Sequence, residues 1–170
     1  IFNNKMIVRF FEPGKTYLKN KERFDKEIQR VLTAGDLILR NDVEVFEKRL
    51  SEYIGTKYAV ALNSGTDALY LALRAMKIGQ GDEVIVPSRT FVATAQVVVQ
   101  IGATPVYVDV GENVLSLITE KTKAIIPVHI EGMVYENMDM ISKVCKEKDI
   151  WLIEDAAQAI GSEYKSLKAG

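Results

Sequence analysis

Apolar residues recur at helical spacing in the first third of the chain. An extended segment over residues 9–14 is expected to lead into a first helix, which Gly35 ends. The apolar face of this helix comprises Phe24, Ile28, Val31 and Leu32. A second amphipathic helix has Asn41 or Asp42 as its cap and Gly55 as its stop. Its apolar positions are Val43, Phe46, Leu50 and Tyr53.

Beyond this region, short apolar runs alternate with helical patterns. Residues 58–62 (Tyr-Ala-Val-Ala-Leu) are typical of a short buried strand, and a helical pattern over residues 67–78 follows them. Segments 69–76 and 91–101 are apolar nearly all round, which predicts that both helices are buried. The alternation of strands and helices favours a parallel sheet.

One apolar run ends in two carboxylates. Residues 150–153 are followed by Glu154 and Asp155, and then by Ala156, Ala157 and Gln158, small or polar residues that can open a helix. In open α/β sheets the ligand crevice lies outside the carboxyl ends of the strands. We therefore expect Asp155 at the floor of such a crevice.

A second strand-to-helix junction has the composition of an anion site. Ser64, Gly65 and Thr66 lie between the predicted strand 58–62 and the helix that follows. Unpaired backbone N–H groups and the helix dipole favour a phosphate there, and Gly65 allows a close approach. The hydroxyls of Ser64 and Thr66 can donate as well, whereas Asp67 is assigned only a helix-start role.

Together these motifs resemble those of the DegT/DnrJ/EryC1/StrS family of sugar aminotransferases, which depend on pyridoxal 5'-phosphate (PLP). The family's Ser-Gly-Thr-Asp-Ala-Leu and Glu-Asp-Ala-Ala-Gln motifs stand letter for letter at residues 64–69 and 154–158. Between them, further motifs follow in family order at residues 81–87, 90–94, 102–106 and 122–129. Any one of these motifs alone is weak, and a Ser-Gly-Thr-Asp string is more often a helix cap than a phosphate site. The ordered set favours a cofactor site.

The resemblance implies a fold and a cofactor site. The fold is α/β, with three α/β/α layers and a mainly parallel sheet, as in the large domain of fold type I PLP-dependent transferases. Residues 1–57 form an N-terminal extended segment with two helices, and residues 58–170 form a partial PLP-binding domain. By analogy, Asp155 binds the ring nitrogen, Phe91 stacks on the ring and Gln158 binds the phenolic oxygen. The phosphate site comprises Ser64, Gly65 and Thr66.

The resemblance also implies an activity that this chain does not complete. Glutamate would donate an amino group through PLP to a nucleotide-linked keto-sugar, in a homodimer. The lysine that forms the aldimine lies a few tens of residues after the aspartate in the family, beyond Gly170. Lys165 and Lys168 lie in a polar hairpin and are expected to be solvated. We therefore expect an N-terminal part that is inactive alone and leaves a sheet edge uncovered.

Two alternatives remain open at this stage. One is a PLP- or PMP-dependent sugar dehydratase of the same family, in which histidine replaces the lysine. The other is a non-catalytic cofactor-binding or assembly module.

Composition excludes several other classes of protein. The 22 basic and 23 acidic residues give a net charge of −1, which argues against nucleic-acid and anionic-membrane partners. No apolar run approaches the roughly 20 residues of a membrane span, and the N-terminus lacks a signal-peptide pattern. The single cysteine, Cys145, is expected to be buried and reduced, which is typical of a cytoplasmic protein. One histidine and one cysteine far apart predict no metal site.

Three residues depart from the family pattern or carry an open role. The family's usual His-Leu-Tyr-Gly reads His129-Ile-Glu131-Gly here, so a carboxylate replaces an aromatic side chain. For His129 we favour a structural role, hydrogen-bonded to backbone, over a catalytic one. Two roles are equally compatible with Arg89: it binds a substrate phosphate or carboxylate, or it is solvated at the surface. The connection over residues 110–118 is shorter than usual in the family, which predicts an altered flank of the sheet.

Overall fold

The computed structural model of the chain describes residues 9, 11–35, 38 and 40–170. These residues divide into two compact units, 1–46 and 47–170. The division falls inside helix α3 (Asn41–Ile54), so the boundary predicted after residue 57 stays a prediction.

The first unit contains helices α1 (Pro13–Lys19) and α2 (Lys21–Ala34). The predicted extended segment is wrong at its end, because α1 begins at Pro13; the fixed φ of proline suits the first helical turn, where its missing N–H costs nothing. Residue 10 of that segment lies outside the described residues. Helix α2 ends as predicted, at Gly35 with a left-handed φ of 70°. Its apolar face is largely exposed.

Helix α3 begins at Asn41, so Asn41 and Asp42 lie in its first turn and neither stands before the helix as the predicted cap. Gly55, at φ 91°, follows its last turn as expected.

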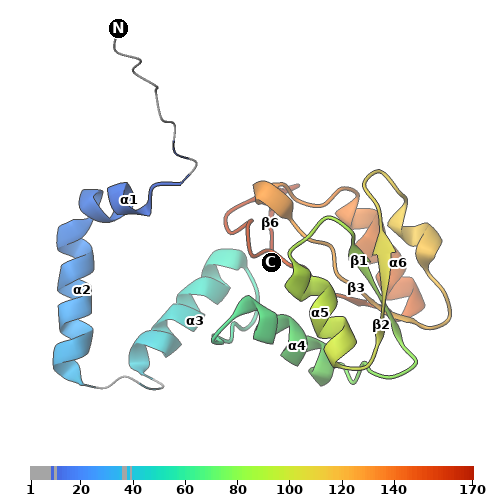
Figure 1. Ribbon diagram of the computed structural model, residues 1–170, viewed down its shortest axis with the longest axis horizontal. Coiled ribbons are helices and arrows are strands. Elements are labelled where there is room, and N and C mark those ends of the chain that lie inside the picture. The colour runs from blue at the N-terminus through green and yellow to red at the C-terminus, as the bar shows by residue number, and fades with distance from the viewer. Residues whose placement is uncertain (1–8, 10, 36–37, 39) are drawn as a thin grey trace, which may run out of the picture. The chain divides into compact units, whose positions relative to one another are not determined.

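The larger unit is built on a parallel four-stranded sheet. Its strands are β1 (Glu83–Pro87), β2 (Thr104–Val108), β3 (Thr122–Ile125) and β4 (Trp151–Leu152). Their spatial order is β2-β1-β3-β4, and every pair is parallel. This confirms the predicted α/β architecture (Figure 1).

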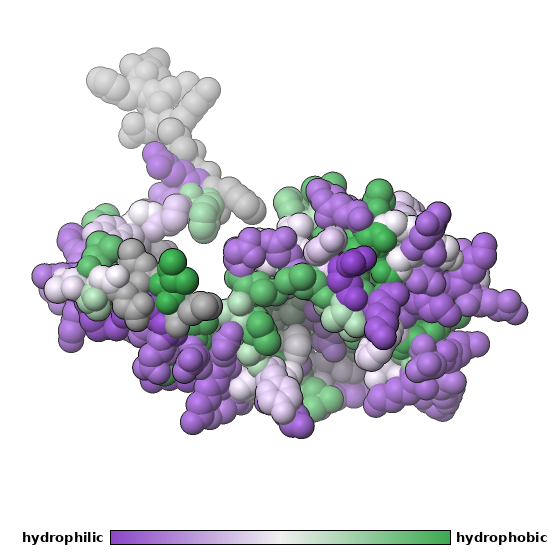
Figure 2. All heavy atoms as spheres, turned by 90° about the horizontal axis from the view of Figure 1, so that it is seen from below, coloured by the Kyte–Doolittle hydropathy of each residue, from purple (hydrophilic) through white to green (hydrophobic). Residues whose placement is uncertain are grey.

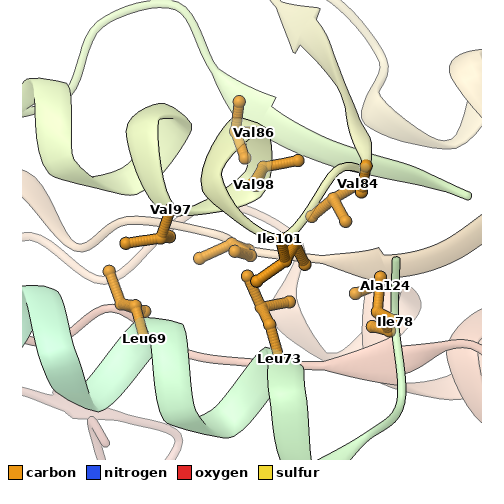
Figure 3. Packing of buried hydrophobic residues seen from close by; sticks show 11 residues of the cluster. Leu69, Leu73, Ile78, Val84, Val86, Val97, Val98, Ile101 and Ala124 are labelled. Carbon is orange, nitrogen blue, oxygen red and sulfur yellow. The ribbon is translucent and has the colours of Figure 1, made fainter. Parts of the chain in front are cut away.

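Helices cover both faces of this sheet, giving three layers (Figure 1). They are α4 (Gly65–Ala75), α5 (Val92–Gln100), η1 (Val114–Leu117) and α6 (Met138–Lys148), whereas η2 (Ile130–Gly132) lies in the connection between β3 and α6. Alternate residues of β1 point to opposite faces: Val84 and Val86 pack with α4 and α5, whereas Ile85 packs with η1 and α6. In Figure 3, Leu69 and Leu73 of α4 point toward the valines of α5 and β1. This core fixes α4 and α5 on the same face of the sheet.

The predictions that the helices over residues 69–76 and 91–101 are buried are wrong in part. Helices α4 and α5 bury only the side that faces the sheet, and Leu71, Val92 and Val99 are 47%, 65% and 61% exposed. Most of the visible face in Figure 2 is polar, with hydrophobic side chains exposed between the charged ones.

The predicted strand over residues 58–62 is not formed. Tyr58 and Val60 are 73% and 75% exposed, and no strand of the described chain pairs with this segment. An apolar run becomes a strand only when a neighbouring strand satisfies its backbone groups. Here the Ala61 N–H donates instead to the Glu47 carboxylate at 2.7 Å.

The chain beyond β4 forms turns and then a hairpin. No helix opens after Asp155; the hairpin consists of β5 (Glu163–Tyr164) and β6 (Leu167–Lys168). Lys165 and Ser166, both at positive φ, form its turn, as expected for a two-residue connection. The helices in the described ranges are all too short or too polar to cross a membrane.

Candidate cofactor site

Asp155 lies beyond the carboxyl ends of the paired strands β3 and β4, as the sequence predicts. Its N–H donates to the carbonyl of Pro127 at 3.0 Å, and its carbonyl accepts from the N–H of His129 at 3.0 Å. These bonds continue the β3–β4 pairing beyond the strands themselves, through a parallel bridge to Val128. The side chain therefore emerges at the edge where open α/β sheets bind ligands.

Two donors fix the orientation of the Asp155 carboxylate. The buried hydroxyl of Thr94 donates to Oδ2 at 3.1 Å, and the N–H of Ala157 donates to Oδ1 at 3.2 Å. A further hydroxyl, from Thr90, lies 3.1 Å from that of Thr94. Each carboxylate oxygen retains a lone pair for a ligand. Thr94 is not among the predicted site residues, although it ends the motif at residues 90–94 and follows Thr90 by four residues, one turn of a helix.

Phe91 stands at the start of the helix that carries Thr94. It occupies the N-cap position of α5, in an extended conformation, and 71% of its surface is exposed. Because Thr94 in the first turn of α5 contacts Asp155, the N-cap position that Phe91 occupies lies toward the same strand end. An exposed aromatic side chain suits stacking on a flat, ring-containing ligand.

Gln158 has one half of its amide engaged. Its Oε1 accepts a hydrogen bond from the N–H of Glu131 at 2.9 Å. Its NH₂ group is therefore directed to donate elsewhere. A ligand oxygen that accepts hydrogen bonds, such as a phenolic oxygen, matches this donor.

The predicted phosphate site is the N-terminus of α4. Ser64 caps the helix: its Oγ accepts from the N–H of Asp67 and donates to the Asp67 carboxylate, both at 3.1 Å. This confirms the helix-start role of Asp67. Within the described chain, the first-turn N–H groups of Gly65 and Thr66 have no protein acceptor. These two N–H groups are left unpaired by the described residues at this end of the helix, while the Ser64 hydroxyl is already engaged.

The phosphate site and Asp155 are connected through the core. Leu69 and Leu73 of α4 pack against Val97 and Val98 of α5, and α5 carries Thr94. Short contacts join Asp155 to Thr94 and Gln158 to Glu131. Phe91 is connected to Asp155 only through the helix that carries Thr94, and the α4 terminus only through helix packing. Among the described residues, no group of three or more potential ligands could hold a metal ion.

His129 is fully buried behind this site. Its Nδ1 accepts from the backbone N–H of Tyr135 at 3.0 Å, so Nε2 carries the proton and donates to Glu154 at 2.9 Å. This hydrogen bond holds the pKa of Glu154 below its ordinary value, against the opposing effect of burial. With both ring nitrogens engaged, the geometry fits the favoured structural role.

The two hairpin lysines are paired with carboxylates. Lys165 contacts Asp139 at 2.6 Å, and Lys168 contacts Glu163 at 2.9 Å. The side chain of Lys168 is only 27% exposed and lies over the ring of Tyr53, so the prediction that it is solvated is wrong. Cys145 is buried in α6 as a free thiol, as predicted.

Comparison with known proteins gives one consistent family. The model of the DegT/DnrJ/EryC1/StrS aminotransferase family matches residues 18–170. The chain is 39% identical to UDP-2-acetamido-2-deoxy-3-oxo-D-glucuronate aminotransferase of Pseudomonas aeruginosa, over 96% of the chain and 47% of that protein. It is 48% identical to GDP-perosamine synthase of Caulobacter vibrioides, over 74% of the chain and 36% of that protein.

A solved structure agrees with these sequence matches. The crystal structure of Streptomyces venezuelae DesV in complex with a ketimine intermediate superimposes with a TM-score of 0.91 at 38% identity. The match covers 96% of the chain and 46% of that protein. The chain thus spans about half the length, or less, of the relatives it matches.

Proposed function

Because the chain belongs to the DegT/DnrJ/EryC1/StrS aminotransferase family, we propose that it forms the PLP-binding part of an enzyme that aminates a nucleotide-linked keto-sugar. Similar proteins are named as aminotransferases or transaminases of UDP- and dTDP-linked sugars. Others have been solved with PLP or PMP. The proposal concerns the intact protein.

The observation that carries the proposal is the fixed carboxylate of Asp155. PLP, when bound, withdraws electrons from a substrate carbanion most effectively if its ring nitrogen is protonated. Asp155 lies at the strand edge with both oxygens oriented by Thr94 and Ala157. In this arrangement the carboxylate would accept a hydrogen bond from the ring nitrogen of bound PLP and so favour its protonated form.

The other residues fit the remaining parts of the cofactor. The exposed Phe91 ring is available to stack, and the amide NH₂ of Gln158 is available to donate to the phenolic oxygen. The free N–H groups of Gly65 and Thr66, at the positive end of α4, bind the phosphate. Ser64 contributes by capping this helix.

We further propose that the lysine bound covalently to PLP is supplied from outside residues 1–170, which alone would not catalyse amino transfer. Lys165 and Lys168 are each held by a carboxylate in or beside the terminal hairpin. The resemblance favours glutamate as donor, a homodimer and a cytoplasmic setting.

Substitution of Asp155 tests this proposal in the intact protein. Asp155→Asn should slow conversion of the bound cofactor by L-glutamate by on the order of 10²-fold or more. Glu120→Gln, which removes an exposed carboxylate just before the amino end of strand β3, should leave the rate within about twofold, a small change in ΔG‡. Equal rates for Asp155→Asn and the unmodified protein would refute the assignment. A cofactor that binds without amino transfer would favour a dehydratase or a binding module.

A further inference from the structure

Arg89 and Glu131, which are 42 residues apart in sequence, form an ion pair at the rim of the proposed cofactor site. Nη2 of Arg89 donates to Oε1 of Glu131 at 2.8 Å, and the two side chains are 63% and 61% exposed. Glu131 is the residue that replaces the family's usual aromatic side chain. Arg89 lies in the connection between β1 and α5.

The surroundings of the pair locate it beside the proposed cofactor ring. Glu131 donates its N–H to Gln158, and Arg89 is two residues before Phe91. Arg89 also lines a cavity of about 610 Å³, a size typical of small-molecule sites. Arg89 thus borders open space that a substrate could occupy, while Glu131 is hydrogen-bonded to a residue proposed to contact the cofactor.

Stability does not account for the pair. Exposed ion pairs add little to folding free energy. Glu131 also has a left-handed backbone, φ 58°, which is unfavourable for a residue with a side chain. A conformation with this cost, held by Gln158, points to a role in the site.

Among the described residues, only Nη2 of the guanidinium is engaged, so its remaining N–H donors are free for a ligand. Substrates of the proposed reaction carry oxyanions: the carboxylate of an amino donor and the phosphates of a nucleotide-linked sugar. A planar guanidinium is well suited to bind either group through two parallel hydrogen bonds.

We propose that Arg89 binds an oxyanion of the substrate, a carboxylate or a phosphate, and that Glu131 holds the guanidinium in position until the anion arrives. The inference rests on the proposed function. It makes Arg89 a substrate-binding residue and Glu131 a positioning residue. It also predicts opposite effects for removal of the two charges.

The test uses the intact protein loaded with PLP and follows the cofactor spectrum. L-Glutamate probes the carboxylate arm, and UDP, GDP and dTDP probe the phosphate arm. Arg89→Gln should raise the half-saturating concentration in one arm about 10- to 100-fold, the effect of losing a charged hydrogen bond. Arg89→Lys keeps the positive charge but loses the planar guanidinium, so its half-saturating concentration should lie between those of the unmodified protein and Arg89→Gln. Glu131→Gln keeps an oxygen that accepts from the guanidinium and removes only the negative charge. It should lower the half-saturating concentration about fourfold, as expected for removing a like charge roughly 5 Å from the anion in water.

Arg74→Gln, on the exposed C-terminal turn of α4, is the matched control and should leave both arms within about twofold, the small effect expected away from a site. The proposal is overturned if Arg89→Gln behaves like this control in both arms, or if Glu131→Gln weakens binding as Arg89→Gln does. If Arg89→Gln fails to load PLP, Arg89→Lys and Glu131→Gln decide. An unmodified protein that responds to neither probe refutes the proposed function itself.

Discussion

Removal of the Thr94 hydroxyl should weaken PLP binding, because Asp155 loses a hydrogen bond that orients its carboxylate. Thr94→Val keeps the branched shape of a 1% exposed side chain but deletes the donor to Asp155 Oδ2. A hydrogen bond to a charged group contributes about 1.5–3 kcal/mol. The 3.1 Å distance is long for a hydroxyl donor and Asp155 is only partly buried, which favours the lower end. About 1.5 kcal/mol corresponds to a roughly tenfold rise in the PLP dissociation constant.

The assay is reconstitution of the intact apoprotein with PLP, followed by absorbance at increasing cofactor concentration. Thr94→Ser retains the hydroxyl while losing a methyl group, so it should bind PLP more tightly than Thr94→Val. The reasoning is refuted if Thr94→Val binds PLP as tightly as the unmodified protein does. It is also refuted if the serine and valine variants are equally weak, because the hydroxyl would then be irrelevant.

Three further predictions concern the fold. Leu73→Ala, at a fully buried position of α4, should lower the free energy of unfolding by about 2–5 kcal/mol in urea denaturation, whereas Leu71→Ala on the exposed side should change it little; equal losses would be inconsistent with the packing. The hydrogen bond from Lys165 lowers the pKa of Asp139 from 3.8 to about 2. The ionised carboxylate therefore stabilises the fold above pH 3.8, and this stabilisation is lost as the pH falls through about 2. Between these two pH values the unfolding midpoint should fall more for the unmodified protein than for Asp139→Asn, and an equal fall in both proteins would exclude the interaction. Cys145 is 2% exposed and burial raises its thiol pKa, so a thiol reagent should react slowly until urea is added; rapid native labelling would count against its burial.

Local patterns predicted most of the architecture. The apolar run over residues 150–153 ends in two carboxylates, and this local pattern is why the strand end at Asp155 lies where the sequence places it. The glycine after α2 and the serine before α4 act through neighbouring backbone groups, so their roles are also readable locally.

Contacts between distant residues could not be read in the same way. Thr94 and Asp155 are 61 residues apart, and Arg89 and Glu131 are 42 apart, so only the folded sheet reveals these pairs. The error at residues 58–62 has the same origin, since strand formation depends on a partner that the segment itself does not encode.

The most direct test of the central claim is to treat the intact protein with PLP and borohydride and to map the added mass. Borohydride fixes a covalent lysine–PLP link. We predict a single modified lysine outside residues 1–170, lost on competition with excess PMP, with Lys165 and Lys168 unmodified. An adduct on either hairpin lysine, or stable PLP binding with no adduct, would contradict the proposal that this chain belongs to a PLP-dependent sugar aminotransferase.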